Sequence, residues 1–151
     1  MEKKIIEPKP VYTTRLVKSE DLNHHGTLFA GRTAEWFVEA GFIAAAKLVN
    51  PQGIVCLKIH GMYFTKPVRP GQILNFTSKV VLTGRSSMVS YIQVTRDGIV
   101  EPFVSGFITF IYVNEETKPT SHFIEILPKT DEDIALFERA KGLKKKQLVI
   151  S

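Results

Sequence analysis

The chain has 151 residues, of which 44% are hydrophobic and 23% are charged. These values exclude an intrinsically disordered chain and predict one domain spanning residues 1–151, with a core from about residue 11 to about residue 128. The longest apolar run is Phe42 to Ala46, far shorter than the roughly 20 residues that a membrane-crossing helix needs. We therefore expect no membrane partner.

The cysteine count indicates the cellular compartment, and the net charge indicates the kind of partner. A single cysteine, Cys56, excludes an internal disulfide and a cysteine-based metal centre, and it favours a reducing compartment such as the cytoplasm. The apolar neighbours of Cys56 predict a buried thiol. The net charge of +5 indicates an anionic partner, and we expect a phosphate-bearing small molecule because the basic residues lack the aromatic pattern of a nucleic-acid interface.

The first half of the chain predicts a strand, a polar loop and a helix. Residues 11–17 have strand character, and residues 19–26 form a polar loop. From about Thr33 to Val49, apolar and small residues recur at helical spacing until Asn50-Pro51 ends the pattern. Apolar residues cover most of the circumference, so we expect a helix enclosed by other structure.

The second half predicts strands at residues 54–65, 73–83, 86–96 and 103–113, separated by turns at Pro70-Gly71, Gly84-Arg85 and Asp97-Gly98. One long helix followed by four antiparallel strands gives an α+β fold in which the sheet curls around the helix, the hotdog arrangement. A peripheral helix is expected at about residues 131–142, capped by Thr130 or Asp131. The first eight residues and the end after Gly142 are expected to be flexible.

The segment before the long helix has the composition of a ligand-binding loop. It contains Asn23, Gly26 and Gly31, and glycine lets a ligand approach the backbone closely. Free amides at a helix start carry partial positive charge, so an N–H near Gly26 or Gly31 is expected to stabilise an oxyanion.

Three motifs in this order resemble those of hotdog-fold acyl-CoA thioesterases. Asn23, Gly26, Gly31 and Trp36 match the family's Asn-x-x-Gly signature, residues 83–88 resemble its Gly-Arg-(Ser/Thr)-Ser-Met hairpin, and residues 68–72 resemble the turn before it. The resemblance spans residues 11–113. It implies hydrolysis of an acyl-CoA thioester to a free acid and CoA, without a metal ion. It also implies no cofactor, since CoA is part of the substrate. It also implies a carboxylate and an asparagine from facing subunits.

The sequence departs from this family at the acid. The family's carboxylate stands two residues after the tryptophan, where this chain has Val38. Glu39 and Glu35 are the nearest replacements, and both lie on one stripe of the helix. Beside apolar side chains, their pKa would rise toward that of a water-activating base. Alternatively, both face solvent, or one of them pairs with Lys47 or with an arginine across a dimer interface.

Other polar residues have two interpretations. Asn23 matches the family's asparagine, or it caps its own loop. His25 and its neighbour His24 have the chemistry of a base or a carbonyl ligand, but their adjacency opposes shared metal binding. We expect Arg85 to contact the phosphates of CoA, with Ser86 and Ser87 adding hydroxyl donors. Alternatively, Arg85 is a solvated turn residue.

Three function classes follow. The first is an acyl-CoA hydrolase. The second is a non-catalytic module that binds acyl-CoA or acyl-carrier protein, which Val38 would explain, and the third is a hotdog hydratase or dehydratase using His25 and Glu39. An open sheet edge predicts a homodimer, and the resemblance adds tetramers or hexamers built from such dimers.

Overall fold

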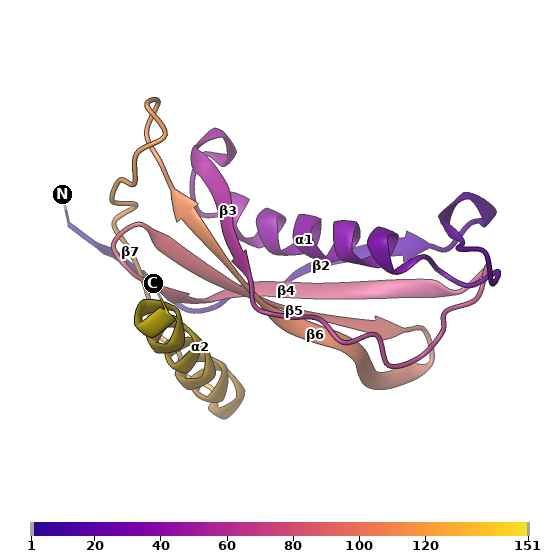
Figure 1. Cartoon of the computed structure of the whole chain (residues 1–151). Coiled ribbons are helices and arrows are strands. Elements are labelled where there is room, and N and C mark those ends of the chain that lie inside the picture. The colour runs from indigo at the N-terminus through magenta and orange to yellow at the C-terminus, as the bar shows by residue number, and fades with distance from the viewer. Residues whose placement is uncertain (1, 151) are drawn as a thin grey trace.

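The structure is a computed structural model that describes residues 2–150. Figure 1 shows a curved sheet with one helix on its concave side and a second helix below. Short 3-10 helices occur at Ser19–Asp21 and Pro51–Gly53. The main elements in chain order are β1 (Lys4–Ile6), β2 (Val11–Leu16), α1 (Ala30–Ala46), β3 (Ile54–Ile59), β4 (Ile73–Thr83), β5 (Ser87–Arg96), β6 (Ile99–Tyr112), β7 (Ile124–Ile126) and α2 (Asp131–Ile150).

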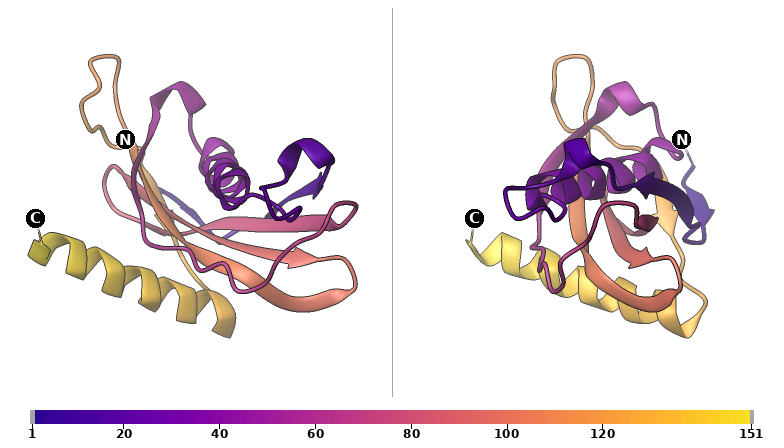
Figure 2. Two further views of the ribbon diagram at one scale, coloured as in Figure 1. Left: turned by 45° about the vertical axis from the view of Figure 1, so that its right-hand side comes forward. Right: turned by 90° about the vertical axis from the view of Figure 1, so that its right-hand side faces the viewer.

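Five strands form one antiparallel sheet in the order β2-β4-β5-β6-β3. The sheet curls around α1, as both views of Figure 2 show. The predicted α+β hotdog arrangement is therefore confirmed. Strand β4 spans the residues that its alternation of apolar and polar side chains predicts, and the Asp97-Gly98 turn, with Gly98 at φ +82°, joins β5 to β6.

Helix α1 lies unusually close to the sheet because small residues face it. A Cβ on Gly41 would lie 2.9 Å from Ile92 Cδ1, so only glycine fits this position without a shift. Two buried hydroxyls reach the helix backbone from the sheet: Ser78 Oγ donates to the Ala40 carbonyl at 2.7 Å, and Ser90 Oγ donates to the Gly41 carbonyl at 2.8 Å. These contacts fix α1 against β4 and β5.

The helix begins three residues earlier than its periodicity predicts. Phe29 occupies the N-cap position although its side chain accepts no hydrogen bond. Its backbone takes the place of a side-chain cap: the Phe29 amide donates to the Asp21 carbonyl at 2.9 Å, and the Phe29 carbonyl accepts from Arg32 and Thr33. Phenylalanine is a poor sequence signal for a helix start, because the usual caps are short polar residues.

Three strand boundaries differ from those that the sequence predicts, because contacts between distant segments determine them. The N-terminal residues expected to be flexible include β1, which pairs in parallel with β7. Strand β3 ends at Ile59, six residues before the expected end, and the chain then turns away through Gly61 at φ +114°. Strand β6 begins at Ile99 because it pairs directly across the turn with Arg96.

Helix α2 is longer than expected and packs against the outer face of the sheet. It extends to Ile150, and the expected cap is confirmed because Thr130 Oγ1 accepts the Asp133 N–H at 3.1 Å. Its buried Leu136 and Ala140 form a second apolar cluster with side chains on the outer face of the sheet: Val81, Leu82, Val89 and Phe107. Within residues 2–150, neither helix combines the length and apolarity needed to cross a membrane.

Replacing Leu136 by alanine tests this packing. Leu136 is 5% exposed, so Leu136→Ala should lower the free energy of unfolding by about 2–5 kcal/mol in urea denaturation. Ile134→Ala on the same helix is the matched control, because Ile134 is 43% exposed and should change stability by less than about 0.5 kcal/mol. Equal effects would show that α2 does not pack as described.

Candidate active site

Asn23 organises the loop that leads into α1. Its Oδ1 accepts the backbone N–H of His25 at 2.9 Å and that of Thr27 at 3.2 Å, while Nδ2 donates to Thr27 Oγ1 at 3.1 Å. The loop-capping interpretation of Asn23 is thus visible in the structure. One hydrogen of Nδ2 remains for a ligand, because a side-chain amide carries two.

Two amides at the start of α1 are open. Within residues 2–150, the N–H groups of Ala30 and Gly31 have no hydrogen-bond acceptor. The Gly26 amide is engaged instead, donating to the Asn23 carbonyl at 3.1 Å, and Gly26 serves the turn with φ +76°. Of the two glycines predicted to hold an oxyanion, Gly31 therefore has the available donor.

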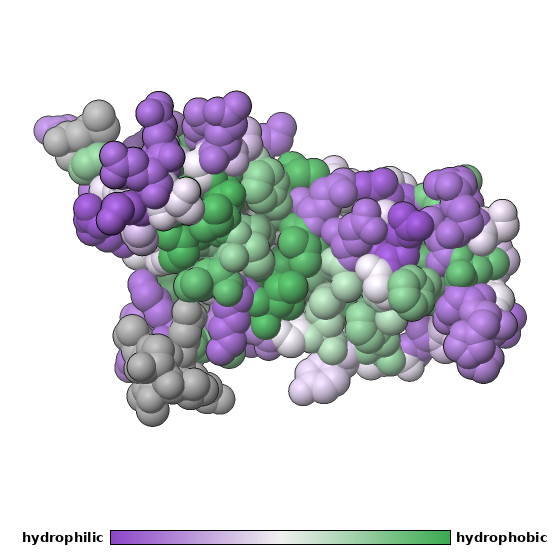
Figure 3. Space-filling view, turned by 45° about the horizontal axis from the view of Figure 1, so that its top comes forward, coloured by the Kyte–Doolittle hydropathy of each residue, from purple (hydrophilic) through white to green (hydrophobic). Residues whose placement is uncertain are grey.

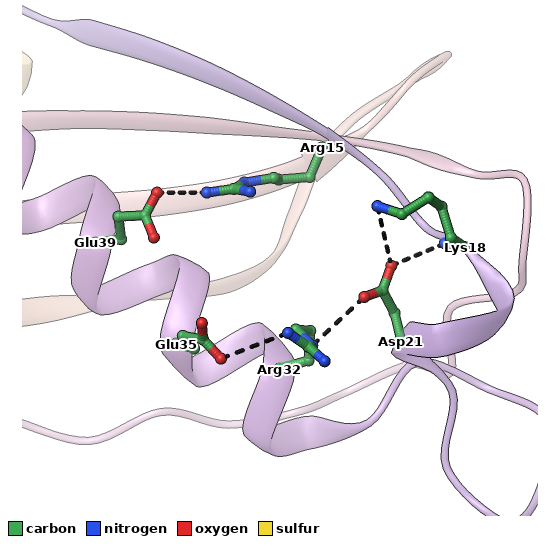
Figure 4. A network of polar contacts seen from close by, with 6 residues as sticks. All are labelled: Arg15, Lys18, Asp21, Arg32, Glu35 and Glu39. Carbon is green, nitrogen blue, oxygen red and sulfur yellow. Dashed lines mark hydrogen bonds and ion pairs between the residues drawn. The ribbon is translucent and has the colours of Figure 1, made fainter.

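A buried carboxylate ties this loop to the helix. Asp21 is 3% exposed and accepts the Lys18 N–H at 2.9 Å. Arg32, in the first turn of α1, lies with Nε 3.4 Å from Asp21 and with Nη1 3.8 Å from Glu35. Figure 4 shows this chain of contacts from the loop to the helix. It holds the open amides in a fixed position relative to Asn23.

Glu39 is held by an arginine of the same chain. Arg15 on β2 forms an ion pair with Glu39 (Figure 4). The Arg15 guanidinium lies 5.4 Å from the ring centroid of Trp36. The Glu35 and Glu39 side chains are 63% and 47% exposed. The apolar surroundings expected for the two glutamates are therefore absent in one chain, and pairing with an arginine is what the structure shows.

The side chains of the remaining predicted positions, Val38, His24 and His25, make no hydrogen bond or ion pair with Glu39 or Arg15 in the described part of the chain. Val38 is half-buried against the core. His24 and His25 are exposed, with ring centroids 4.0 Å apart. In the described part of the chain, no hydrogen bond or ion pair joins either histidine to Glu39.

The three residues predicted to bind CoA at the hairpin after β4 differ in their exposure. Arg85 is exposed and Ser86 is half-buried. Ser87 is buried, and both its carbonyl and its Oγ accept the Gly84 N–H at 3.1 Å, so Ser87 shapes the turn. A groove of about 540 Å³ lies beside the hairpin, and Arg85 is on its wall. Arg85 is thus the residue that can reach an anionic ligand.

Cys56 is exposed on β3 rather than buried as predicted. A buried strand and an edge strand can both carry an apolar run, which misled the prediction. Partial desolvation raises the pKa of its thiol, which does not favour a nucleophile.

The hairpin and the loop before α1 lie at opposite ends of the sheet (Figure 1). Leu16 pairs with Ile73 at the start of β4, and Thr83 ends the strand at the hairpin. Ten steps along a strand cover about 33 Å. One chain therefore brings Asn23 and Gly31 together but keeps Arg85 far from both.

Sequence reasoning missed Arg15 and Asp21. The alternation along β2, with Val11, Thr13 and Arg15 half-buried and their neighbours exposed, was the available signal that Arg15 points toward the helix. Nothing local marks Asp21 as buried. In the described part of the chain, no group of three or more His, Cys, Asp or Glu residues is arranged to hold a metal ion.

Comparisons with known proteins identify a family whose model covers α1 but begins after Asn23. The model of the thioesterase superfamily matches residues 25–103, which include α1, β3, β4 and β5. The uncharacterized acyl-CoA thioester hydrolase YkhA of Bacillus subtilis is 27% identical over 138 residues, covering 89% of this chain and 78% of the relative.

Two solved structures have the same architecture. An apo-hexameric acyl-CoA thioesterase superposes with a TM-score of 0.82 at 29% identity, covering 91% of this chain and 89% of the other. An acyl-CoA hydrolase from Bacillus cereus has a TM-score of 0.82 at 27% identity, covering 93% of this chain and 87% of the other.

Two substitutions of Asn23 test its role in the loop. Asn23→Ala removes every side-chain bond described above and should lower the free energy of unfolding by about 1–2 kcal/mol. Asn23→Asp keeps the oxygen that accepts from His25 and Thr27, and it should cost less than about 0.5 kcal/mol. Urea denaturation measures both, and a loop that tolerates alanine without loss would contradict the assignment.

Proposed function

The chain belongs to the thioesterase superfamily, and we propose that it hydrolyses the thioester bond of acyl-CoA to a free acid and CoA. The observation that carries this proposal is the pair of open amides at Ala30 and Gly31, beside the loop that Asn23 organises. The names of the relatives support the substrate class, since they are acyl-CoA hydrolases. The exposed Cys56, the single cysteine, suits a reducing compartment such as the cytoplasm.

In this mechanism the amides of Ala30 and Gly31 bind the thioester oxygen. Glu39 takes a proton from a water molecule, whose oxygen attacks the carbonyl carbon, and the amides stabilise the resulting oxyanion. The carbon–sulfur bond then breaks, and the CoA sulfur leaves with the proton. Arg15, whose guanidinium lies over the Trp36 ring, orients Glu39 for this step, and no metal or separate cofactor is required.

The distances within one chain favour a site shared by two protomers. Glu39 lies nine residues after Ala30, which is about 13 Å along the helix, whereas a general base works within hydrogen-bond reach of its proton. Arg85 lies still farther away, at the other end of β4. We therefore assign Glu39 and Arg85 to the thioester bound at a partner's α1.

The edge strand β3 provides the surface for this pairing. Its Val55, Leu57 and Ile59 are 39%, 52% and 40% exposed, and no strand pairs with its outer edge in the described chain. Figure 3 shows apolar surface gathered over the middle of one face of the molecule. A two-fold axis through β3 would reverse the partner, so that its hairpin and this chain's α1 start share one end. Larger assemblies of such dimers, tetramers or hexamers, are proposed on the example of the hexameric thioesterase.

One observation favours a second candidate, a non-catalytic acyl-CoA binding module. Val38 replaces the family's acid, and Glu39 is already engaged with Arg15. A hydratase or dehydratase has less support, because His25 has no bond to Glu39 among the described contacts. Turnover separates the two candidates.

The decisive experiment measures the hydrolysis of a panel of acyl-CoAs that differ in chain length. The release of the free CoA thiol reports the rate. Wild type should turn over, and Glu39→Gln should lower kcat by about 100-fold or more, since a general base typically contributes that much. Glu35→Gln should have a smaller effect because Glu35 is more exposed and more loosely paired. Glu138→Gln on α2 is the control for losing a surface carboxylate.

Different results would change the assignment. If no acyl-CoA is hydrolysed but CoA derivatives bind, the binding-module candidate replaces the enzyme. If Glu35→Gln abolishes turnover and Glu39→Gln does not, the base is Glu35.

Light scattering tests the dimer. The wild-type protein should be a dimer or larger at micromolar concentration, and Leu57→Lys should shift it toward the monomer by placing like charges on the paired edges. Leu127→Lys is the matched control, because Leu127 is 48% exposed but lies away from β3. A monomeric wild type, or equal effects of both substitutions, would contradict pairing through β3.

A further inference from the structure

A buried histidine joins the hairpin of Arg85 to the segment that precedes α2. We call residues 121–126 the strap, and they lie beside residues 83–87 along the groove described above. The His122 amide donates to the Arg85 carbonyl at 3.2 Å, and its ring Nε2 lies 2.9 Å from the Ser87 carbonyl. The strap therefore holds the hairpin at its tip and at Ser87.

The bonding partners of His122 define its protonation state. The side chain is 8% exposed. Its Nε2 faces the Ser87 carbonyl, which can only accept, and its Nδ1 lies 3.0 Å from the Ile124 N–H, which can only donate. The ring is therefore neutral, with its hydrogen on Nε2. A second proton on Nδ1 would face the Ile124 N–H and break that bond.

The surroundings also favour the neutral ring. Burial lowers the pKa of His122, the carbonyls of Ser87 and Gly84 partly oppose this, and the charge of Lys3 lowers it further. Charged side chains from every neighbouring element line the adjoining grooves or contact Ser87: Lys3, Arg85, Glu115, Glu125 and Lys144. Because the folded state disfavours the charged ring, His122 stabilises the fold above the ordinary histidine pKa of about 6.5, and this contribution is lost as the pH falls below it.

We propose that neutral His122 is a positioning residue for coenzyme A binding: it holds the hairpin so that Arg85 can contact a phosphate group, and its protonation releases the hairpin. This inference rests on the proposed function and adds a pH dependence to substrate affinity. It places the effect in KM and leaves kcat unchanged, because Arg85 contacts a phosphate of CoA, whereas the groups that act on the thioester, the open amides and Glu39, lie on α1.

Two substitutions divide the ring's bonds between them. His122→Gln retains a donor near the position of Nε2, so it can reach the Ser87 carbonyl and cannot be protonated. His122→Asn retains an acceptor near Nδ1 but is too short to reach Ser87. His60→Gln is the control, because His60 is a partly buried histidine bonded to Thr109 Oγ1 rather than to the hairpin.

Hydrogen exchange of the ligand-free protein tests the structural part of the proposal. The amides of Gly84 and residue 122 should lose protection in the wild type and in His60→Gln between about pH 7.5 and about pH 5.5, after correction for intrinsic rates. His122→Gln should keep the same protection at both values. Unchanged protection in the wild type, or an equal loss in His122→Gln, would overturn the proposal.

Calorimetry with CoA and steady-state kinetics test the functional part. His122→Asn should bind CoA about fivefold more weakly at neutral pH, which corresponds to one lost hydrogen bond, and should raise KM with kcat unchanged. His122→Gln should bind like the wild type at about pH 7.5 and should weaken less than the wild type at about pH 5.5, where the phosphate monoester of CoA gains a proton in both cases. Wild-type affinity in His122→Asn, or a loss that lies in kcat, would overturn the role.

The two experiments separate failure of this inference from failure of the proposed function. A wild-type protein that binds no CoA would remove both the proposed function and the role of His122 in it. In that case the exchange data would still show whether the strap holds the hairpin.

Discussion

The close approach of α1 to the sheet is the constraint on which the rest of the structure depends. It requires a helix face without bulk at Gly41, and it is secured by hydroxyls of Ser78 and Ser90 that bind the helix backbone. Because these bonds are buried, a helix that moved away would leave polar groups unpaired. The sheet must curl to cover such a helix, and the curl leaves β2 and β3 as its two edges.

The same constraint positions the groups of the candidate active site. With α1 fixed, the Asp21–Arg32 ion pair and the Asn23 loop determine where the first helical amides lie. Arg15 reaches Glu39 from β2 because that strand lies beside the helix. The site thus depends on contacts between three segments, and none of the three would hold a ligand alone.

Sequence patterns predicted the elements with strong local signals. Strand β4 has a regular alternation and clear turns at both ends, and the Thr130 cap is a short polar residue before a helical pattern. The start of α1 was missed because Phe29 is not a typical cap. The pairing of β1 with β7 escaped prediction, since three-residue strands carry no periodicity of their own.

The site could be predicted in its residues but not in its environment. Glycines and an asparagine before a helix point to open amides, and this local pattern led to Gly31. The ion pair of Glu39, the buried Asp21 and the exposure of Cys56 depend on which strand lies at an edge or beside the helix. These features depend on tertiary contacts, which the local sequence pattern does not reveal. The role of each candidate in hydrolysis stays a prediction.

The position of α2 limits which side of the sheet a second copy of the chain can reach. Leu136 and Ala140 already occupy the convex side of the sheet near the hairpin, so two protomers cannot stack those convex sides against each other there without displacing it. Another molecule that approached this side would meet the outer surface of α2 instead of the strands. In this way a C-terminal helix determines which surface the convex side presents to solvent.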